Sequence, residues 1–342
     1  MRQFCFAFSV VVSLGAGLAA HAQTQAQTQA GACGGRNIFV TYPQATQDRI
    51  RMRADAVPFS RGLVWRADRG GEVVTLVGTM HVPDSRYDGL LDQLDPMLNE
   101  ATQLLVEAGP KEEARLLKAM RTDQDLMFLT DTTLPEMLPE DLWQSLRQAA
   151  QARGIPSVLL AKMRPGYATI ALSIPSCMVV AMQSGGVGVD KALMARAAQR
   201  QVPVHALEAY DTLFTLLDQV TDAEAVEMLR YTAQSMAGAE DDMATMADLY
   251  ATGDIQMIWE FSRTRALQAG ATPEEVERQM QLSEEVMLDA RNAAWIDVIE
   301  GAAERGPVMV AAGALHLPGE GGVLSRLKAR GWQITPLIAK LP

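Results

Sequence analysis

The sequence predicts an α/β fold in which helices flank a central, mostly buried sheet and a large helical insertion caps it. Short apolar runs that end in Gly or Glu alternate with long stretches of helical periodicity, which is typical of this fold class. The chain of 342 residues is 48% hydrophobic and 21% charged, so it has enough apolar material for a packed core.

Residues 1–22 are typical of a signal peptide. Arg2 precedes an apolar stretch over residues 4–20, and Ala20-His21-Ala22 gives the small-x-small pattern of a cleavage site. We expect cleavage to leave Gln23 as the N-terminus of an exported protein, periplasmic or secreted; an uncleaved anchor is the alternative. No later stretch approaches the roughly 18 unbroken apolar residues of a membrane helix, so no span is expected after cleavage.

Residues 23–58 are predicted to be low in complexity and loosely held, because they begin with repeated Gln-Thr-Gln-Ala and remain polar. Cleavage would leave Cys33 and Cys177. An oxidising compartment allows a disulfide between them, and two unpaired thiols are the alternative. Lipid modification of Cys33 is disfavoured because it lies too far beyond the apolar stretch.

Residues 59–342 are predicted to form the folded domain. Arg69-Gly70-Gly71 joins two strands as a hairpin signal, and breaks at Gly253 and Pro273 divide a long helical region. The expected strands cover residues 62–68, 72–77, 103–106, 202–207, 307–312 and 332–337. The expected helices cover residues 88–101, most of 110–200, 223–304 and 320–330, and the two long blocks among them are predicted to form the cap.

Two of the three histidines that would follow the signal peptide lie in near-copies of one phrase. Gly78-Thr79-Met80-His81 and Gly313-Ala314-Leu315-His316 each follow an apolar strand and precede an aliphatic residue and Pro. Glycine permits a tight turn and a close backbone approach, and the carboxyl edge of an open α/β sheet is where ligands bind. A single such residue is best interpreted as an ordinary loop histidine, but the pair favours function. The third, His205, is predicted to be a buried, hydrogen-bonded core histidine.

Glu107 and Glu208 each end a short apolar strand, so parallel pairing would place them on the same rim as His81 and His316. Imidazole nitrogens and carboxylate oxygens suit a divalent metal such as Mn, Co or Zn, which lowers the pKa of a bound water. One Glu would be a ligand and the other a general base, in either order. The alternative for each is an ordinary acid that caps a helix or forms a surface pair.

Two further polar residues have simpler interpretations. Asp190 precedes a helix and is predicted to be an N-cap. Arg291 lies in a helix beside apolar residues; facing inward it could stabilise an oxyanion, but the residues alone favour a solvated or salt-bridged arginine.

Several function classes are disfavoured. The net charge of −11 and the pI near 4.9 argue against a nucleic-acid partner, which needs a basic surface. The sequence contains no Gly-x-Ser-x-Gly elbow, no phosphate loop that ends in Lys-Ser or Lys-Thr, and no His-Glu-x-x-His. It carries no sign of a preferred oligomeric state.

The order and spacing of several short motifs over residues 62–337 resemble the TraB/GumN family, which includes the Tiki-type metalloproteases. The motifs are the two Gly-x-x-His phrases, Leu105-Val106-Glu107, Gly188-Val189-Asp190, Leu207-Glu208, Tyr250, Gly253-Asp254, Arg291-Asn292, Gly319, Gly322 and Gly331. The resemblance implies a fold related to the erythromycin esterase and ChaN group, metal-dependent hydrolysis, and a place for Arg291 in the site.

Three functions remain open at this point. A metallohydrolase would cleave a peptide or a small amide or ester, with His81 and His316 as ligands and Arg291 stabilising negative charge. A binding protein would sequester a peptide or a metal at the same rim without turnover. A structural scaffold would not use the rim at all.

Overall fold

The computed structural model describes residues 33–218, 220–236 and 238–342. The predicted signal peptide and the repeat at residues 23–29 lie outside this part of the chain. Within it, six strands form one mixed sheet in the order β4-β3-β5-β2-β1-β6. The strands are β1 (Val64–Arg69), β2 (Glu72–Thr79), β3 (Gln103–Val106), β4 (Val204–Ala206), β5 (Val308–Gly313) and β6 (Gln333–Ile338). The predicted α/β fold is confirmed.

The parallel half of the sheet determines where the functional loops lie. β5 pairs in parallel with both β2 and β3, and β3 pairs in parallel with β4. In this register Thr79 lies opposite Gly313, and Val106 lies opposite Ala311. The loops after β2, β3 and β5 therefore leave the sheet at one edge. β1 pairs antiparallel with β2, and β6 pairs antiparallel with β1, so these two strands widen the sheet beyond β2.

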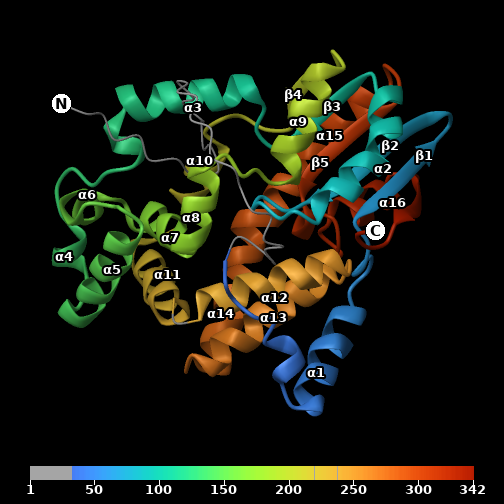
Figure 1. Cartoon of the computed structure of the whole chain (residues 1–342). Helices are drawn as coiled ribbons and strands as arrows, with labels where there is room; N and C mark the ends of the chain where they lie inside the picture. Colours follow the sequence, from blue (N-terminus) through green and yellow to red (C-terminus); the bar gives the residue numbers. More distant parts are fainter. Residues whose placement is uncertain (1–32, 219, 237) are drawn as a thin grey trace, which may run out of the picture.

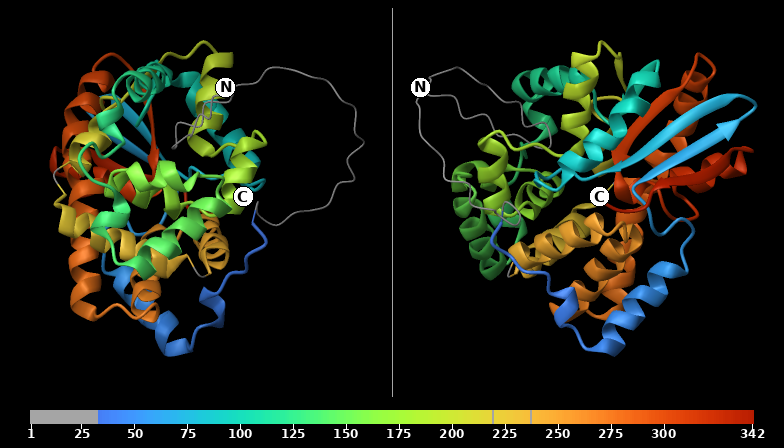
Figure 2. Two further views of the ribbon diagram at one scale, coloured as in Figure 1. Left: turned by 90° about the vertical axis from the view of Figure 1, so that its left-hand side faces the viewer. Right: turned by 45° about the vertical axis from the view of Figure 1, so that its right-hand side comes forward.

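Helices cover both faces of the sheet (Figures 1 and 2). Neighbouring strand residues alternate between the two cores: Val77, Leu104 and Met309 face one, while Leu76, Leu105 and Val310 face the other. The first core includes residues of α1 (Gln44–Asp55), α2 (Tyr87–Glu100), α9 (Val189–Gln199), α12 (Ala239–Ala251) and α13 (Ile255–Gln268). The second includes residues of α15 (Ala290–Ala303) and α16 (Val323–Ala329).

The helical insertion has a hydrophobic core of its own, which includes Leu134, Leu146, Leu160 and Leu229. Figure 1 shows its short helices grouped at the left, beside the sheet and opposite the β1–β2 hairpin. Its elements are α3 (Pro110–Thr122), η2 (Gln124–Leu126), α4 (Leu134–Met137), α5 (Glu140–Ala152), α6 (Ser157–Lys162), α7 (Pro165–Ser173), α8 (Ser176–Gln183), α10 (Thr212–Leu217) and α11 (Asp222–Ser235). We call this group the cap.

Three consecutive helical elements lead to the second core of the sheet. α14 (Pro273–Glu284) continues through a π-helical turn, η3 (Glu285–Asp289), into α15. Such turns insert one extra residue and often mark functional sites. A short 3-10 turn, η4 (Ala314–His316), follows β5 and carries the second motif histidine.

The expectation that the chain is loosely held up to residue 58 is wrong for residues 33–58. Residues Phe39–Thr41 form η1, and α1 packs on α13 and buries Ile50 and Ala54. Only these two residues of the mostly polar helix α1 are buried, so hydrophobic periodicity did not reveal the helix. At the start of this segment Cys33 forms a disulfide with Cys177 of α8, which decides between the two alternatives for the cysteines.

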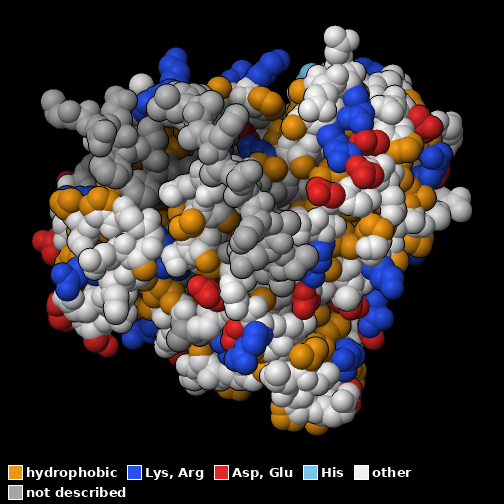
Figure 3. Space-filling model, in the orientation of Figure 1, with side chains coloured by type: hydrophobic (Ala, Val, Ile, Leu, Met, Phe, Trp, Pro, Cys, Tyr) orange, Lys and Arg blue, Asp and Glu red, His pale blue; other side chains and the backbone are white. Residues whose placement is uncertain are grey.

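The surface and the helix lengths add two observations. On the face in Figure 3, acidic and basic side chains are interspersed rather than gathered in one field. Among the described residues no single helix has the length and hydropathy to cross a bilayer, although α7 and α8, bent by 78°, meet that test as a pair.

The disulfide gives a first prediction. It joins residues 144 positions apart, so replacing both cysteines by Ser is expected to lower the free energy of unfolding by about 2–5 kcal/mol, because the unfolded chain gains conformational freedom. The melting temperature should fall by roughly 3–8 °C. Reductant should lower the melting temperature of the wild type to that of the Cys33→Ser/Cys177→Ser variant and leave the variant unchanged. Two free thiols in the oxidised, folded wild type would contradict the structure.

Candidate active site

The two Gly-x-x-His motifs pack directly against each other. A Cβ atom at Gly78 would lie 3.1 Å from both Cα and Cβ of Ala314. A Cβ atom at Gly313 would lie 3.2 Å from Glu107 Oε1 and 3.2 Å from His81 Nε2. Neither glycine has a positive φ angle, and both lie within their strands, so neither position needs the conformational freedom of glycine. Close approach explains both residues: a side chain on either one would push the functional groups apart.

The His316 imidazole is buried and held in a defined orientation. Its Nδ1 atom lies 2.7 Å from Asn292 Oδ1, and its ring packs on Trp295 with 4.4 Å between ring centroids. Because an amide oxygen only accepts, Nδ1 carries the proton and Nε2 offers its lone pair to the site. Burial lowers the pKa of His316 to about 4, despite the opposing charge of Glu107, so the ring is neutral.

The His81 imidazole is oriented in the same way but is half-exposed. Its Nδ1 atom lies 3.3 Å from Asp190 Oδ1, while its Nε2 atom faces Glu107. Partial loss of water around the ring lowers the pKa, but the charges of Asp190 and Glu107 outweigh this effect and raise it to about 9. Both motif histidines therefore point Nε2 inward. Nδ1 of His316 is hydrogen-bonded to Asn292, whereas Nδ1 of His81 lies within ion-pair distance of Asp190.

Glu107 lies between the two imidazoles. Its Oε1 atom is 3.8 Å from His81 Nε2 and 3.9 Å from His316 Nε2, and it accepts a 2.6 Å hydrogen bond from the backbone N–H of Gly313. Burial alone would raise the pKa of this carboxyl. His316, Arg291 and His81 together outweigh burial and hold the pKa far below its usual range, so Glu107 stays ionised.

Arg291 joins the two glutamates, and it is the second residue after the π-helical turn. Its Nε and Nη2 atoms donate to both oxygens of Glu208, at 2.9 and 2.7 Å, and Nη2 also donates to Glu107 Oε2 at 2.7 Å. Its Nη1 atom contacts the Met287 carbonyl at 3.1 Å and His316 Nε2 at 3.3 Å. All five guanidinium N–H groups are engaged, and the side chain is 8% exposed.

The family model for TraB/PrgY/gumN matches residues 63–336. The chain belongs to the TraB/PrgY/gumN family. No curated protein matches the chain.

In this TraB/PrgY/gumN member the fold brings all five of the predicted site residues together, but Glu208 differs from Glu107. Both Glu208 oxygens bind Arg291, and Oε2 also accepts from Trp295 Nε1 at 3.0 Å. Glu208 therefore holds Arg291, while Glu107 faces the imidazoles. Arg291 faces inward and is also salt-bridged, so the two interpretations hold together, and only the solvated form is wrong.

Two predictions about neighbouring residues are wrong. Asp190 is not an N-cap: Gly188 occupies the cap position of α9 and lies so close to the first motif that its Cβ would be 2.6 Å from His81 Cα. This contact brings Asp190, in the first turn, to His81. His205 is exposed instead of buried, because β4 is an edge strand and leaves this residue open to solvent.

Asn292 was missed as a site residue. It sits beside Arg291 on the buried face of α15 and connects His316 to the Gly321 carbonyl through a 3.1 Å hydrogen bond. The signal that could have revealed it is its position next to Arg291. Where the buried face of a helix is wide, two adjacent residues can both lie on that face.

His81, His316 and Glu107 are the residues that could hold a divalent cation. Ligand atoms in a tetrahedral site with bonds of about 2.0–2.2 Å lie about 3.4 Å apart, so separations of 3.8 and 3.9 Å need only a small closure. Among the described residues no group of three or more His, Cys, Asp or Glu side chains is already arranged to hold a metal ion. The Arg291 Nη1 contact with His316 Nε2 must be released before that nitrogen can bind a metal.

The buried ion pairs give a second prediction. Arg291→Met leaves two mostly buried carboxylates without their guanidinium partner, and it should lower the free energy of unfolding by about 3–5 kcal/mol. Arg291→Met/Glu208→Gln should lose less than the sum of the two single variants, since one of the unpaired charges is gone. Arg278→Met, which removes an exposed ion pair with Glu227, is the control and should change little in urea unfolding. Additive losses in the double variant would contradict the coupling.

Proposed function

We propose that the chain is an exported, metal-dependent hydrolase that cleaves peptide or other amide bonds. The observation that carries the proposal is the convergence of His81 Nε2, His316 Nε2 and Glu107 Oε1 at the carboxyl edge of the parallel strands. Each imidazole has a second polar side chain at its Nδ1 atom, Asn292 for His316 and Asp190 for His81, which is the arrangement that orients histidine ligands of metals.

The charge of the site supports a divalent cation. Glu107, Glu208 and Asp190 contribute three carboxylates, and Arg291 supplies one guanidinium. With His316 neutral and His81 protonated, one carboxylate is left without a compensating charge. Binding of Mn, Co or Zn would displace the His81 proton, and the ion would then neutralise the two negative charges that remain. His81, His316 and Glu107 would hold the metal, and the metal would supply an acidified water and polarise a carbonyl.

The remaining residues divide the other tasks. Glu107 is the carboxylate beside both imidazoles, so binding the metal or accepting the proton of the attacking water falls to it rather than to Glu208. Glu208 and Trp295 position Arg291. Arg291 stabilises developing negative charge once its Nη1 group turns from His316 to the substrate.

One observation favours a second candidate, a protein that sequesters a peptide or a metal without turnover. Every N–H group of Arg291 already has an acceptor, so none is free in this arrangement to stabilise an oxyanion. A binding protein needs no such group and would use the same rim.

The disulfide supports export. Cys33–Cys177 is a bond that persists in oxidising compartments such as the periplasm or the extracellular space. This agrees with the signal peptide predicted for residues 1–22.

Metal content gives a third prediction. The chain from Gln23, purified without a histidine tag and incubated with Mn, Co or Zn, should carry close to one metal ion per chain by elemental mass spectrometry. His81→Ala and His316→Ala should each lose it, because each removes a ligand, whereas His205→Ala should retain it because that residue is exposed on β4. Metal-free wild type under all three conditions would rule out the metal site.

Turnover gives a fourth prediction and separates the two candidate functions. In a peptide-library assay read by mass spectrometry, Glu107→Gln should reduce kcat by about 10²-fold or more, since the carboxylate at the reacting centre is lost. Glu208→Gln should have a smaller effect that acts through Arg291. A wild type that binds peptides without cleaving any, and a Glu107→Gln variant that binds them equally well, would favour the sequestering protein.

A further inference from the structure

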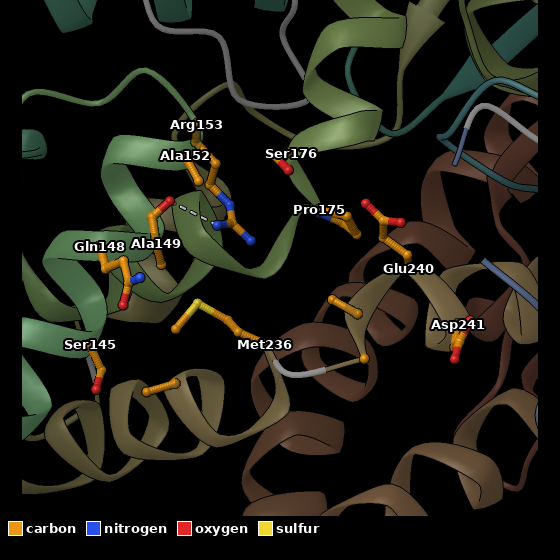
Figure 4. Close-up of a pocket in the computed structure, with 13 residues that line it drawn as sticks. Ser145, Gln148, Ala149, Ala152, Arg153, Pro175, Ser176, Met236, Glu240 and Asp241 are labelled. Carbon is orange, nitrogen blue, oxygen red and sulfur yellow. Dashed lines mark hydrogen bonds between the residues drawn. The ribbon is translucent and has the colours of Figure 1, made fainter. Parts of the chain in front are cut away.

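A hollow lies between the cap and the start of α12, and none of its lining residues belongs to the cluster around Glu107. It has a volume of about 720 Å³, within the range of small-molecule sites. α5, the start of α8, and the junction between α11 and α12 form its walls (Figure 4). The polar side chains that line it include Arg153, Glu240 and Asp241.

Arg153 is the unusual member of this lining. Its Nε atom donates to the Ile174 carbonyl at 2.7 Å and its Nη1 atom to the Ala149 carbonyl at 2.9 Å. These two contacts fix the guanidinium at the ends of α5 and α7. Within the described part of the chain no carboxylate pairs with Arg153, and burial lowers the pKa of this arginine. A half-buried cation without a counter-charge is unfavourable, and an anion in the hollow would relieve it.

The opposite wall has the opposite charge. Glu240 and Asp241 lie in the first turn of α12, and Figure 4 shows Arg153 and Glu240 on opposite sides of the hollow. Asp241 Oδ1 accepts a 2.8 Å hydrogen bond from the backbone N–H of Arg36, whereas Glu240 is exposed. The hollow is therefore positive at one end and negative at the other.

The walls of the hollow are fixed by cross-links that do not involve the ligand. Ser176 on its rim precedes Cys177, whose disulfide to Cys33 ties α8 to the N-terminal segment. The same segment binds α12 through Arg36 and through the Ile38 N–H, which donates to Thr245 Oγ1 at 2.9 Å. The Arg153 guanidinium and the first turn of α12 are therefore held in place before any ligand arrives, which lowers the entropy cost of binding.

We propose that this hollow is a binding site for a small zwitterion, an amino acid or a short peptide, whose carboxylate pairs with Arg153 and whose ammonium group pairs with Glu240. A guanidinium fixed by carbonyl groups on one side presents its remaining N–H groups to a carboxylate. The separation of the two charged ends then selects the length of the ligand. The site is distinct from the rim of His81 and His316, and it does not depend on the hydrolase proposal.

Isothermal titration of the mature chain with glycine, Gly-Gly and Gly-Gly-Gly tests the site, because the series varies only the distance between the two charges. One member is expected to bind one-to-one and more tightly than the others. Acetyl-Gly-Gly and Gly-Gly amide, or the corresponding capped forms of the best binder, should each bind at least about tenfold more weakly, since each loses one ion pair.

Variants locate the binding. Arg153→Gln should weaken the zwitterion at least about tenfold yet leave the affinity for the amide form unchanged, since only the carboxylate contact is lost. Arg147→Gln, an exposed arginine on the same helix, is the matched control and should bind normally. Because Arg153 also caps two helices, Glu240→Gln provides a second variant at an exposed position, and it should weaken the zwitterion but not the acetylated form.

Glu107→Gln should bind the zwitterion like the wild type. The proposal is overturned if no member of the series binds, if Arg153→Gln and Glu240→Gln bind as the wild type does, or if Glu107→Gln abolishes binding, which would place the ligand at the rim.

Discussion

The parallel pairing of β2 with β5 is the constraint on which the candidate site depends. It places Thr79 opposite Gly313, so the two motifs leave the sheet side by side, and β3 delivers Glu107 between them. The two motif glycines are needed because they lack a side chain and not because of their backbone conformation. A Cβ atom at Gly313 would crowd both Glu107 and His81. A shift of one residue in this register would turn the strand residues toward the opposite core and separate the imidazoles.

The site is built from charges that compensate one another in layers. Glu107 is surrounded by two imidazoles and one guanidinium, and that guanidinium is held in turn by Glu208 and Trp295. Asn292 and Asp190 orient the imidazoles from behind. Burying this many polar groups costs stability unless each has a partner. The network therefore favours the one side-chain arrangement in which the groups are paired. A cation at its centre would complete the compensation.

The sequence predicted the elements that depend on local periodicity and the residues that depend on strand ends. All six strands and the rim of His81, Glu107, Glu208 and His316 follow from short apolar runs with functional residues at their exits. It did not separate the roles of Glu107 and Glu208, because that difference arises from Arg291, whose position follows a π-helical turn that periodicity does not reveal. The predictions for Asp190 and His205 failed for a related reason, because both depend on tertiary structure. Asp190 reaches His81 through the contact of Gly188 with the first motif, and His205 is exposed because β4 is an edge strand.

The proposal that the two motifs and Glu107 form one metal site is tested most directly by a crystal structure. The chain from Gln23 would be soaked in manganese, and anomalous scattering would locate the ion. The account predicts one strong anomalous peak within bonding distance, about 2.0–2.3 Å, of Nε2 of His81, Nε2 of His316 and an oxygen of Glu107. Arg291 Nη1 should have turned away from His316 in the same map. Clear density for all three side chains with no anomalous peak among them, or a peak bound elsewhere, would contradict it.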